Sequence, residues 1–273
     1  MIKLVAIDLD DTLLDSKLSI SPPTVDAIRQ AIKAGVMVTL ATGRMYQSAL
    51  PYALELGLDV PLVTYHGALV KTSKTRETLY HKTVSVQLAK QVIQAAEARG
   101  FTGINLYMND EVYVGNNNTT IMEYSQMARV DYTRVEDLPG VLTTGADKIM
   151  VIDAEAKLDA LAPVLRDMVG ERLHITKSKP HFLEITHPEA TKGHALEFLA
   201  GRLGISRAEI MAVGDSYNDL EMLEFAGLGV AMGNARPAVK ERADFVTLAN
   251  DAHGVAEAIR KFVLAEHVPD SGE

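Results

Sequence analysis

The feature that most constrains the fold is a short apolar run near the N-terminus that ends in a cluster of acids. Residues 4–7 are apolar or small at every position, which indicates a buried β-strand. Asp8, Asp10 and Asp11 follow directly. Two carboxylates ~4 Å apart repel by about 4 kcal/mol at an effective dielectric of about 20, so water or a cation has to offset the crowding. A solvated acidic turn and a catalytic site both agree with this stretch alone.

A helix pattern and a second strand pattern follow. Residues 22–34 predict a helix, with Ser21 as its N-cap and a proline at its first position. Residues 36–41 then form a mostly apolar run that predicts a second buried strand. Strand, helix and strand in this order are typical of a parallel sheet that is buried on both faces.

The segment Thr42-Gly43-Arg44 follows the second predicted strand and opens a second predicted helix over residues 44–56. In open parallel sheets, ligands bind at the carboxyl ends of the strands. We therefore expect Asp8, Asp10 and Thr42 to lie along one edge of the sheet.

The alternation of strands and helices stops near residue 84 and returns near residue 189. Between these points the pattern predicts helices and strands in mixed order, with a turn at Asn109-Asp110. We predict an α/β fold with a Rossmann-like, doubly wound parallel sheet and an inserted α+β domain. The predicted parts are a discontinuous core of residues 1–83 and 189–273 and an insertion of residues 84–188.

A second apolar strand pattern, at residues 210–213, also ends in acids, Asp215 and Asp219. Its simplest interpretation is an ordinary N-cap, in which Asp215 or Ser216 accepts from the first N–H groups of the next helix. However, two strands of one parallel sheet would bring Asp215 to the same edge as Asp8. The two acids would repel there unless a cation lay between them. Hard oxygen ligands, without cysteine, favour Mg²⁺ over zinc.

The composition argues against several kinds of partner. A formal charge of −9 argues against nucleic acid, and no apolar run approaches the ~20 residues of a membrane helix. The chain has no cysteine and no room for a signal peptide before its first strand, which favours a cytoplasmic protein. An anionic small substrate would therefore need a local cationic feature. The oligomeric state stays open, and residues 269–273 are expected to be a disordered tail.

Four motifs in order give the chain a specific resemblance. They are Asp8-Leu9-Asp10-Asp11-Thr12, Thr42-Gly43-Arg44, Lys192-Gly193 and Gly214-Asp215-Ser216-Tyr217-Asn218-Asp219. Together they resemble the haloacid dehalogenase-like phosphatase superfamily, in its Cof-type branch with a C2-type cap. The resemblance covers the whole chain and implies that the insertion is a cap that closes over the core.

The resemblance also implies the chemistry. Asp8 would attack phosphorus and form an aspartyl-phosphate, and Asp10 would act first as general acid and then as general base. Mg²⁺ would be held by the carboxylates of Asp8 and Asp215 and by the backbone carbonyl of Asp10.

The resemblance further implies a set of groups that grip the phosphoryl oxygens. The set comprises the Thr42 hydroxyl, the Gly43 N–H at a helix start, Lys192, the Leu9 N–H and Asn218. Asp219 would stand behind these groups and orient Lys192 or a metal-bound water.

The resulting hypothesis is a Mg²⁺-dependent phosphomonoesterase for a small phosphorylated metabolite, most readily a sugar phosphate. A phosphomutase with the same phosphoaspartate, or a dedicated FMN or pyridoxal phosphate phosphatase, is an alternative. A phosphoaspartate-switched signalling module fits less well, because the long insertion and the second acidic motif are unexplained by it. A catalytically silent binding protein would not need the full set of acids and lysine.

Two positions depart from the family's pattern. Asp11 stands where much of the family has glycine, and we expect no loss of chemistry from it. His66-Gly67 stands where Cof-type relatives usually have Asn-Gly, which leaves the substrate contact of that asparagine open. Polar residues of the insertion could face the leaving group, but the sequence does not show which face points inward. The candidates are Tyr107, Lys148, His181 and Glu184.

Overall fold

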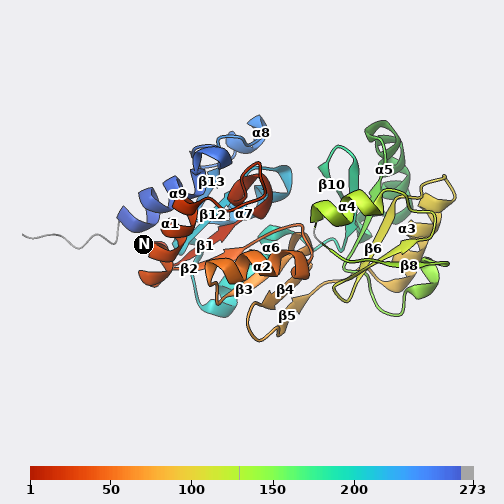
Figure 1. Ribbon diagram of the computed structural model, residues 1–273, viewed down its shortest axis with the longest axis horizontal. Coiled ribbons are helices and arrows are strands. Elements are labelled where there is room, and N and C mark those ends of the chain that lie inside the picture. The colour runs from red at the N-terminus through yellow and green to blue at the C-terminus, as the bar shows by residue number, and fades with distance from the viewer. Residues whose placement is uncertain (129, 266–273) are drawn as a thin grey trace, which may run out of the picture.

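The computed structural model describes residues 1–128 and 130–265. The predicted disordered tail, residues 269–273, lies outside the described residues. Figure 1 shows two lobes side by side, one built around a parallel sheet and the other around a mainly antiparallel sheet. Among the described residues, no helix is long and apolar enough to cross a membrane.

The parallel sheet has five strands in the order β14-β13-β12-β1-β2. Their bounds are Leu4–Ile7 (β1), Met37–Leu40 (β2), Ile210–Gly214 (β12), Leu228–Ala231 (β13) and Phe245–Val246 (β14). The central strand β1 pairs with β2 on one side and with β12 on the other, in register from Leu4 opposite Met37 and Ile210. The two strands that end in acids are therefore neighbours, as their patterns predicted.

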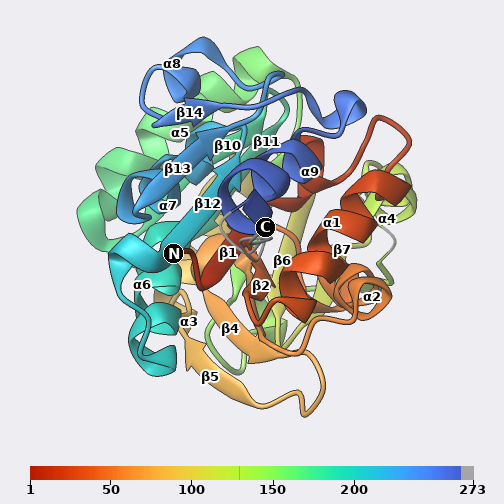
Figure 2. The same ribbon diagram turned by 90° about the vertical axis from the view of Figure 1, so that its left-hand side faces the viewer.

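Helices cover both faces of this sheet. In Figure 2, α1 (Pro22–Lys33) and α9 (Gly254–Ile259) lie on one side, and α6 (Lys192–Leu203) and α7 (Leu220–Phe225) lie on the other. The predicted α/β fold with a doubly wound parallel sheet is confirmed. Two further helices belong to this lobe: α2 (Tyr46–Leu56) and α8 (Pro237–Lys240).

A small antiparallel sheet extends the parallel one. It contains β3 (Pro61–Thr64), β4 (Leu69–Thr72) and β5 (Thr78–His81). A single parallel bridge between Ala41 and Val63 joins it to the end of β2. The strand β3 therefore pairs mainly in a hairpin sheet, because the chain turns back directly after Thr64 and provides β4 as its partner.

The second lobe contains a six-stranded sheet in the order β10-β11-β9-β6-β7-β8. Its strands are Ile104–Met108 (β6), Glu111–Gly115 (β7), Thr133–Val135 (β8), Lys148–Ile152 (β9), His174–Lys179 (β10) and Phe182–Thr186 (β11). All pairs are antiparallel except β7 with β8. Its helices are α3 (Val86–Glu97), α4 (Ile121–Ala128) and α5 (Glu155–Val169).

The two faces of this sheet belong to different apolar clusters because side chains alternate along each strand. Ile149 and Val151 of β9 belong to a cluster with α3 and α5. Met150 and Ile152, on the opposite face, belong to the same cluster as the parallel sheet. The face that carries Met150 is therefore turned towards the parallel sheet. The residue limits of the predicted insertion, 84 and 188, stay a prediction.

Two predicted helix starts were wrong in detail. The second helix begins at Tyr46 rather than Arg44, because residues 42–45 are held in a loop. The helix expected directly after Asp215 and Ser216 begins with a 3₁₀ turn at Tyr217 and becomes α-helical at Leu220. Ser21 stands at the N-cap position of α1, as predicted, but its side chain contacts the Thr24 hydroxyl at 3.0 Å and makes no capping bond to the helix backbone.

Candidate active site

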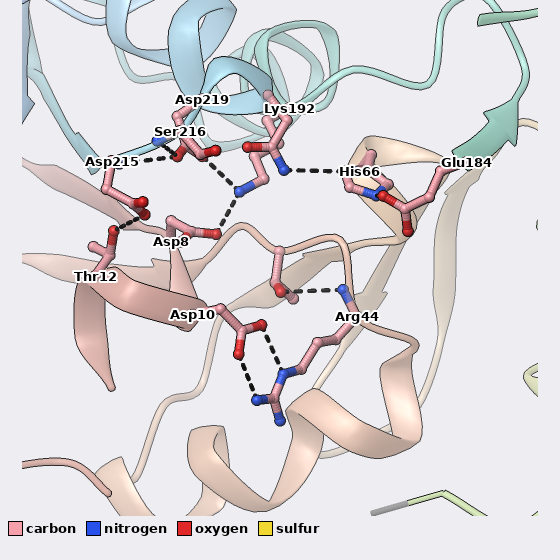
Figure 3. A network of polar contacts seen from close by, with 12 residues as sticks. Asp8, Asp10, Thr12, Arg44, His66, Glu184, Lys192, Asp215, Ser216 and Asp219 are labelled. Carbon is pink, nitrogen blue, oxygen red and sulfur yellow. Dashed lines mark hydrogen bonds and ion pairs between the residues drawn. The ribbon is translucent and has the colours of Figure 1, made fainter. Parts of the chain in front are cut away.

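The turn after β1 separates the side chains of the first acidic cluster. The N–H groups of Leu13 and Leu14 donate to the carbonyls of Asp8 and Leu9, so residues 9–13 form one tight turn. Asp11 has a left-handed φ of 60°, which aspartate tolerates better than most residues. As Figure 3 shows, Asp8 points to one side of the turn, towards Lys192, and Asp10 to the other, towards Arg44.

Asp8, Asp215 and Asp219 form a carboxylate cluster around one lysine. One oxygen atom from each carboxylate lies within 4.8 Å of the others. Lys192 Nζ donates to Asp8 Oδ1 at 2.5 Å and to Asp219 Oδ1 at 2.6 Å, and its side chain is fully buried. Thr12 donates its hydroxyl to Asp215 Oδ1 at 2.8 Å. The predicted residues of both acidic motifs and Lys192 thus lie together at the carboxyl ends of β1 and β12.

Asp219 is the fully buried acid of the cluster, and the role of orienting Lys192 that the resemblance implies for it stays a prediction. Its Oδ2 accepts from the backbone N–H groups of Asp215 and Ser216, at 3.0 and 2.9 Å. Its other oxygen accepts from Lys192. Because both oxygens are engaged, Asp219 fixes the backbone of Asp215 and the ammonium group of Lys192 at once.

The cluster has more negative than positive charge. Burial raises the pKa of Asp8 well above its ordinary value, and the nearby Asp219 and Asp215 raise it further against the opposing effect of Lys192. Burial and then the charge of Asp219 raise the pKa of Asp215 to about 7. Burial opposes the charge of Lys192, but Asp219 and Asp8 outweigh it and raise its pKa. Three carboxylates face one ammonium group here, so a further cation would stabilise the ionised cluster.

Asp10 is held away from this cluster by Arg44. The guanidinium group donates from Nε to Asp10 Oδ2 at 2.8 Å and from its terminal nitrogen to Oδ1 at 2.6 Å. Burial opposes ionisation of Asp10, but the Arg44 hydrogen bonds and charge outweigh it and lower its pKa. The Asp10 carboxylate is therefore directed towards Arg44 and away from the carboxylate cluster, and the metal-binding role predicted for its backbone carbonyl stays a prediction.

Residues 42–45 form a loop that lies close to the His66 loop. Thr42 Oγ1 accepts from the Arg44 N–H at 3.1 Å, which leaves the hydroxyl hydrogen available to a ligand. A Cβ at position 43 would lie 2.3 Å from His66 Cε1, so only glycine fits there. Within residues 1–128 and 130–265, no hydrogen bond is recorded from the N–H of Leu9 or Gly43. Gly43 lies before the helix, not at its first turn.

A second buried charged cluster connects the two lobes. Lys148 of β9 donates to Glu184 Oε1 of β11 at 2.6 Å and to the Gly43 carbonyl at 3.0 Å. His66 Nε2 lies 2.9 Å from Glu184 Oε2, at an ion-pair distance without the angle of a hydrogen bond. The Asn218 amide nitrogen lies 3.2 Å from His66 Nδ1.

The electrostatics of this second cluster are balanced. Burial alone would raise the pKa of Glu184, but His66 and Lys148 outweigh it and lower the pKa well below its ordinary value. Burial opposes the charge of Lys148, but Glu184 raises its pKa above the ordinary value. The cluster therefore stays ionised without any further ligand.

Between the two clusters lies a cavity of about 140 Å³. Asp8, Asp10, Asp215 and Asn218 line it from the parallel sheet's lobe. The six-stranded sheet's lobe contributes Tyr124, Lys148, Ser178, Lys179, Phe182 and Glu184. Of the four polar candidates in the insertion, Lys148 and Glu184 line the cavity. Tyr107 packs beneath Lys148, and His181 contacts the Phe182 ring on the β10–β11 turn.

Three contacts of this site were not predicted from the sequence. The sequence assigned no partner to Arg44, yet it binds Asp10, 34 positions away. The hydrogen bond from the Thr12 hydroxyl to Asp215 joins the first acidic motif to the second, and this contact was not predicted from the sequence. The contacts of His66 with Asn218 and Glu184 had no signal apart from its unusual place before Gly67.

Known proteins resemble the chain along nearly its full length. The profile of the haloacid dehalogenase-like hydrolase family matches residues 5–259. The chain is 35% identical over 274 residues to YxeH of Bacillus subtilis (strain 168), covering 97% of this chain and 100% of that protein. It is 32% identical over 262 residues to the 5-amino-6-(5-phospho-D-ribitylamino)uracil phosphatase YitU of the same strain, covering 95% and 97%.

The fold comparison agrees. A haloacid dehalogenase-like hydrolase from Bacteroides thetaiotaomicron has a TM-score of 0.89 and 29% identity, covering 96% of this chain and 99% of that chain. The resemblance first indicated by four short motifs is thus confirmed by the full-length comparisons. The chain belongs to the haloacid dehalogenase-like hydrolase family and is a phosphatase that acts on phosphoric monoesters.

Proposed function

We propose that the protein is a Mg²⁺-dependent phosphomonoesterase that hydrolyses a small phosphorylated metabolite through an aspartyl-phosphate on Asp8. The observation that carries this proposal is the position of Asp8 within the under-neutralised carboxylate cluster, at the wall of a cavity with cationic groups. A carboxylate nucleophile splits one difficult displacement at phosphorus into two easier ones.

The residues of the cluster fit Mg²⁺. Asp8 and Asp215 each keep one carboxylate oxygen that is not engaged by Lys192 or Thr12, while both oxygens of Asp219 are engaged. The donors are hard oxygens, which suit this ion. We assign Asp8, Asp215 and the backbone carbonyl of Asp10 as ligands, with Asp219 supporting them. When bound, the ion offsets the repulsion between the carboxylates and the phosphate charge.

The chain's own groups supply the proton transfers. In the first step the Asp8 carboxylate forms a bond to phosphorus while the bond from phosphorus to the alcohol oxygen breaks. Asp10 protonates that departing oxygen. In the second step water attacks phosphorus, Asp10 takes its proton, and inorganic phosphate leaves with Asp8 restored. In this structure Arg44 engages both oxygens of Asp10 and lowers its pKa, so Asp10 has to leave Arg44 and take up a proton before it acts as the acid.

The phosphoryl group is held by groups from both halves of the parallel sheet's lobe. The Thr42 hydroxyl and the N–H groups of Leu9 and Gly43 have donor hydrogens available. Lys192 adds a buried positive charge, and Asn218 lies across the cavity. Preorganised donors of this kind stabilise the charge that develops on phosphoryl oxygens. Together these groups provide the local cationic feature that an anionic substrate needs in a protein with a formal charge of −9.

The cavity supports a small polar leaving group. Its volume of about 140 Å³ lies below the roughly 300–1,000 Å³ typical of pockets for larger ligands, which favours a sugar phosphate over FMN. Lys148, Glu184 and Ser178 offer partners for hydroxyl groups. We assign residues 84–188 as the cap that reads this leaving group and excludes water. The name of YitU makes a phosphorylated ribitylaminouracil a second candidate to test.

The test is a phosphate-release assay across sugar phosphates, FMN, pyridoxal phosphate and a phosphorylated ribitylaminouracil, with and without EDTA. Asp8→Asn should lower the rate of phosphate release at least about a thousandfold, since it removes the nucleophile. Asp15→Asn is the matched control, because its side chain only accepts from Lys17 and Ser19 N–H groups in a turn.

Release that survives both EDTA and Asp8→Asn would refute the proposal. Product analysis separates the phosphatase from a phosphomutase, since a mutase would yield a phosphorylated isomer with little free phosphate.

A further inference from the structure

We propose that Asp110, at the tip of the hairpin between β6 and β7, is a positioning residue for the phosphate-binding loop of residues 42–45. It belongs to the lobe of the six-stranded sheet, whereas the loop belongs to the lobe of the parallel sheet. The inference rests on the proposed function, which assigns phosphoryl binding to Thr42 and Gly43. It goes further because it makes the order of that loop depend on the docking of the other lobe.

The helix that follows the loop has no cap of its own. Met45 stands at its N-cap position and has no side-chain acceptor for the first free N–H groups. Asp110 Oδ1 accepts from the N–H of Tyr46 at 3.0 Å and from that of Gln47 at 3.4 Å. A carboxylate from the opposite lobe therefore supplies the cap, with the charge that a helix N-terminus favours.

The same carboxylate oxygen also fixes the second segment that borders the loop. Tyr65, whose side chain is fully buried, donates its hydroxyl to Asp110 Oδ1 at 2.8 Å. The Tyr65 N–H donates to the Arg44 carbonyl at 2.9 Å, and the His66 N–H donates to the Thr42 carbonyl at 3.0 Å. Asp110 thus contacts the start of α2 and the segment at Tyr65. These are the two stretches of chain between which Thr42 and Gly43 are held.

Asp110 is itself rigidly placed. Asn109 and Asp110 both have a left-handed φ, 56° and 63°, as a tight hairpin turn requires. The Asp110 N–H donates to Asp147 Oδ2 at 3.2 Å, and the other oxygen of the buried Asp147 lies 2.6 Å from His81 Nε2. The Gln47 side chain donates to the Asp110 carbonyl at 2.8 Å. The Asp110 carboxylate can therefore leave the N-terminus of α2 only if the whole β6–β7 hairpin moves away with it.

This arrangement couples two events. Docking of the hairpin orders the start of α2 and the loop before it, so it raises the affinity of the loop for a phosphoryl group. By linkage, a bound phosphoryl group favours docking to the same extent. A contact that only joined the lobes would lower stability on removal without changing how tightly phosphate binds.

The experiment measures inhibition by inorganic phosphate, with Mg²⁺ present, in the full-length protein and four variants. Asp110→Ala should raise the phosphate inhibition constant about five- to tenfold, as expected for a lost N-cap. Asp110→Asn keeps an acceptor oxygen and should stay within about threefold of the wild type. Tyr65→Phe removes one hydroxyl and should fall between the two. Asp137→Ala is the control, because Asp137 caps the distant Gly140 N–H and should leave the constant unchanged.

A wild-type inhibition constant in Asp110→Ala would overturn the inference, and so would an equal rise in Asp110→Asn. If Asp110→Ala does not fold, Tyr65→Phe decides: an unchanged constant rejects the inference and a rise supports it. Failure of the wild type to bind phosphate at all would instead reject the proposed function, so the two failures are distinguishable.

Discussion

The molecule contains two buried charged clusters with opposite electrostatics. In the carboxylate cluster, Asp8, Asp215 and Asp219 share Lys192, and the pKa values of Asp8 and Asp215 are raised. In the cluster between the lobes, Glu184 faces Lys148 and His66, and its pKa is lowered. Apart from the half-buried Asp215, the members of both clusters are buried, so burial does not explain the difference. The ratio of acidic to basic side chains explains why the pKa values are raised in one cluster and lowered in the other.

The difference indicates what each cluster needs. A balanced buried cluster is satisfied by its own members and holds two segments together. A cluster with surplus acid is satisfied only when a cation or a reaction removes the surplus. The cluster with surplus acid is thus suited to react, and the balanced cluster is suited to hold two segments together. The two clusters face each other across one cavity.

The largest effect should come from removing the one lysine of the carboxylate cluster. Lys192→Met leaves Asp8 and Asp219 buried without their shared partner, which typically costs about 3–5 kcal/mol. We also expect phosphatase activity to fall at least about a hundredfold. Chemical denaturation in EDTA and a phosphate-release assay measure the two losses. Lys33→Met, at an exposed helix end, is the control, and equal stability of both variants would contradict the comparison.

A smaller loss is expected from the balanced cluster. Glu184→Gln removes the charge that pairs with Lys148 but keeps an oxygen acceptor, so the free energy of unfolding should fall by about 2 kcal/mol. The effect on activity should appear mainly in KM, because the side chain lines the cavity without touching Asp8. Glu189→Gln, which removes an exposed pair with Lys82, should behave as wild type. A Glu184→Gln variant as stable as this control would break the comparison.

The two clusters should respond to pH in opposite directions. Asp215 ionises near pH 3.8 when unfolded and near 7 when folded, so EDTA-treated protein should lose stability as the pH rises from about 4 to 7. Glu184 has a lowered pKa, so its contribution is present above its ordinary value of 4.5 and is lost as the pH falls. Thermal unfolding across pH tests both slopes. Added Mg²⁺ should remove the loss towards pH 7, and a slope that Mg²⁺ does not change would argue against the metal site.

The smallest effect is expected at His66. Its φ of 59° is left-handed, a conformation that asparagine adopts at little cost, so His66→Asn should lower stability by less than about 1 kcal/mol. His66→Ala should lose about 1–2 kcal/mol more, because alanine is strained there. Activity of the asparagine variant should stay within a few-fold of wild type. Equal stability of the two variants would show that the backbone conformation does not decide this position.

Much of the fold follows from local patterns. The strand Lys148–Ile152 and the helix Lys192–Leu203 can be located from the sequence alone, because an apolar run marks the strand and a glycine C-cap marks the end of the helix. The strand Thr133–Val135 was missed. It is short, polar and half exposed, and it is defined only by pairing with β7. The start of α2 was misplaced because contacts with residues 65 and 66 keep residues 42–45 out of the helix.

The site divides in the same way. Motif residues could be found because each acid follows a strand whose end is visible in the sequence. The partners of those acids could not. Arg44 lies 34 positions from Asp10, and Glu184 approaches His66 only because the six-stranded sheet turns that face inward. Such contacts depend on how separate elements dock, which a single sequence does not encode locally.

The position of β1 between β2 and β12 has a consequence for biosynthesis. Leu4 pairs with Ile210, so one edge of β1 lacks its partner until more than two hundred further residues have been made. At roughly 5–20 residues per second this wait lasts about 10–40 s, and all six strands of the other lobe are synthesised during it. The nascent chain thus exposes the edge that ends in the nucleophile, and a cell must protect that edge from pairing with other chains.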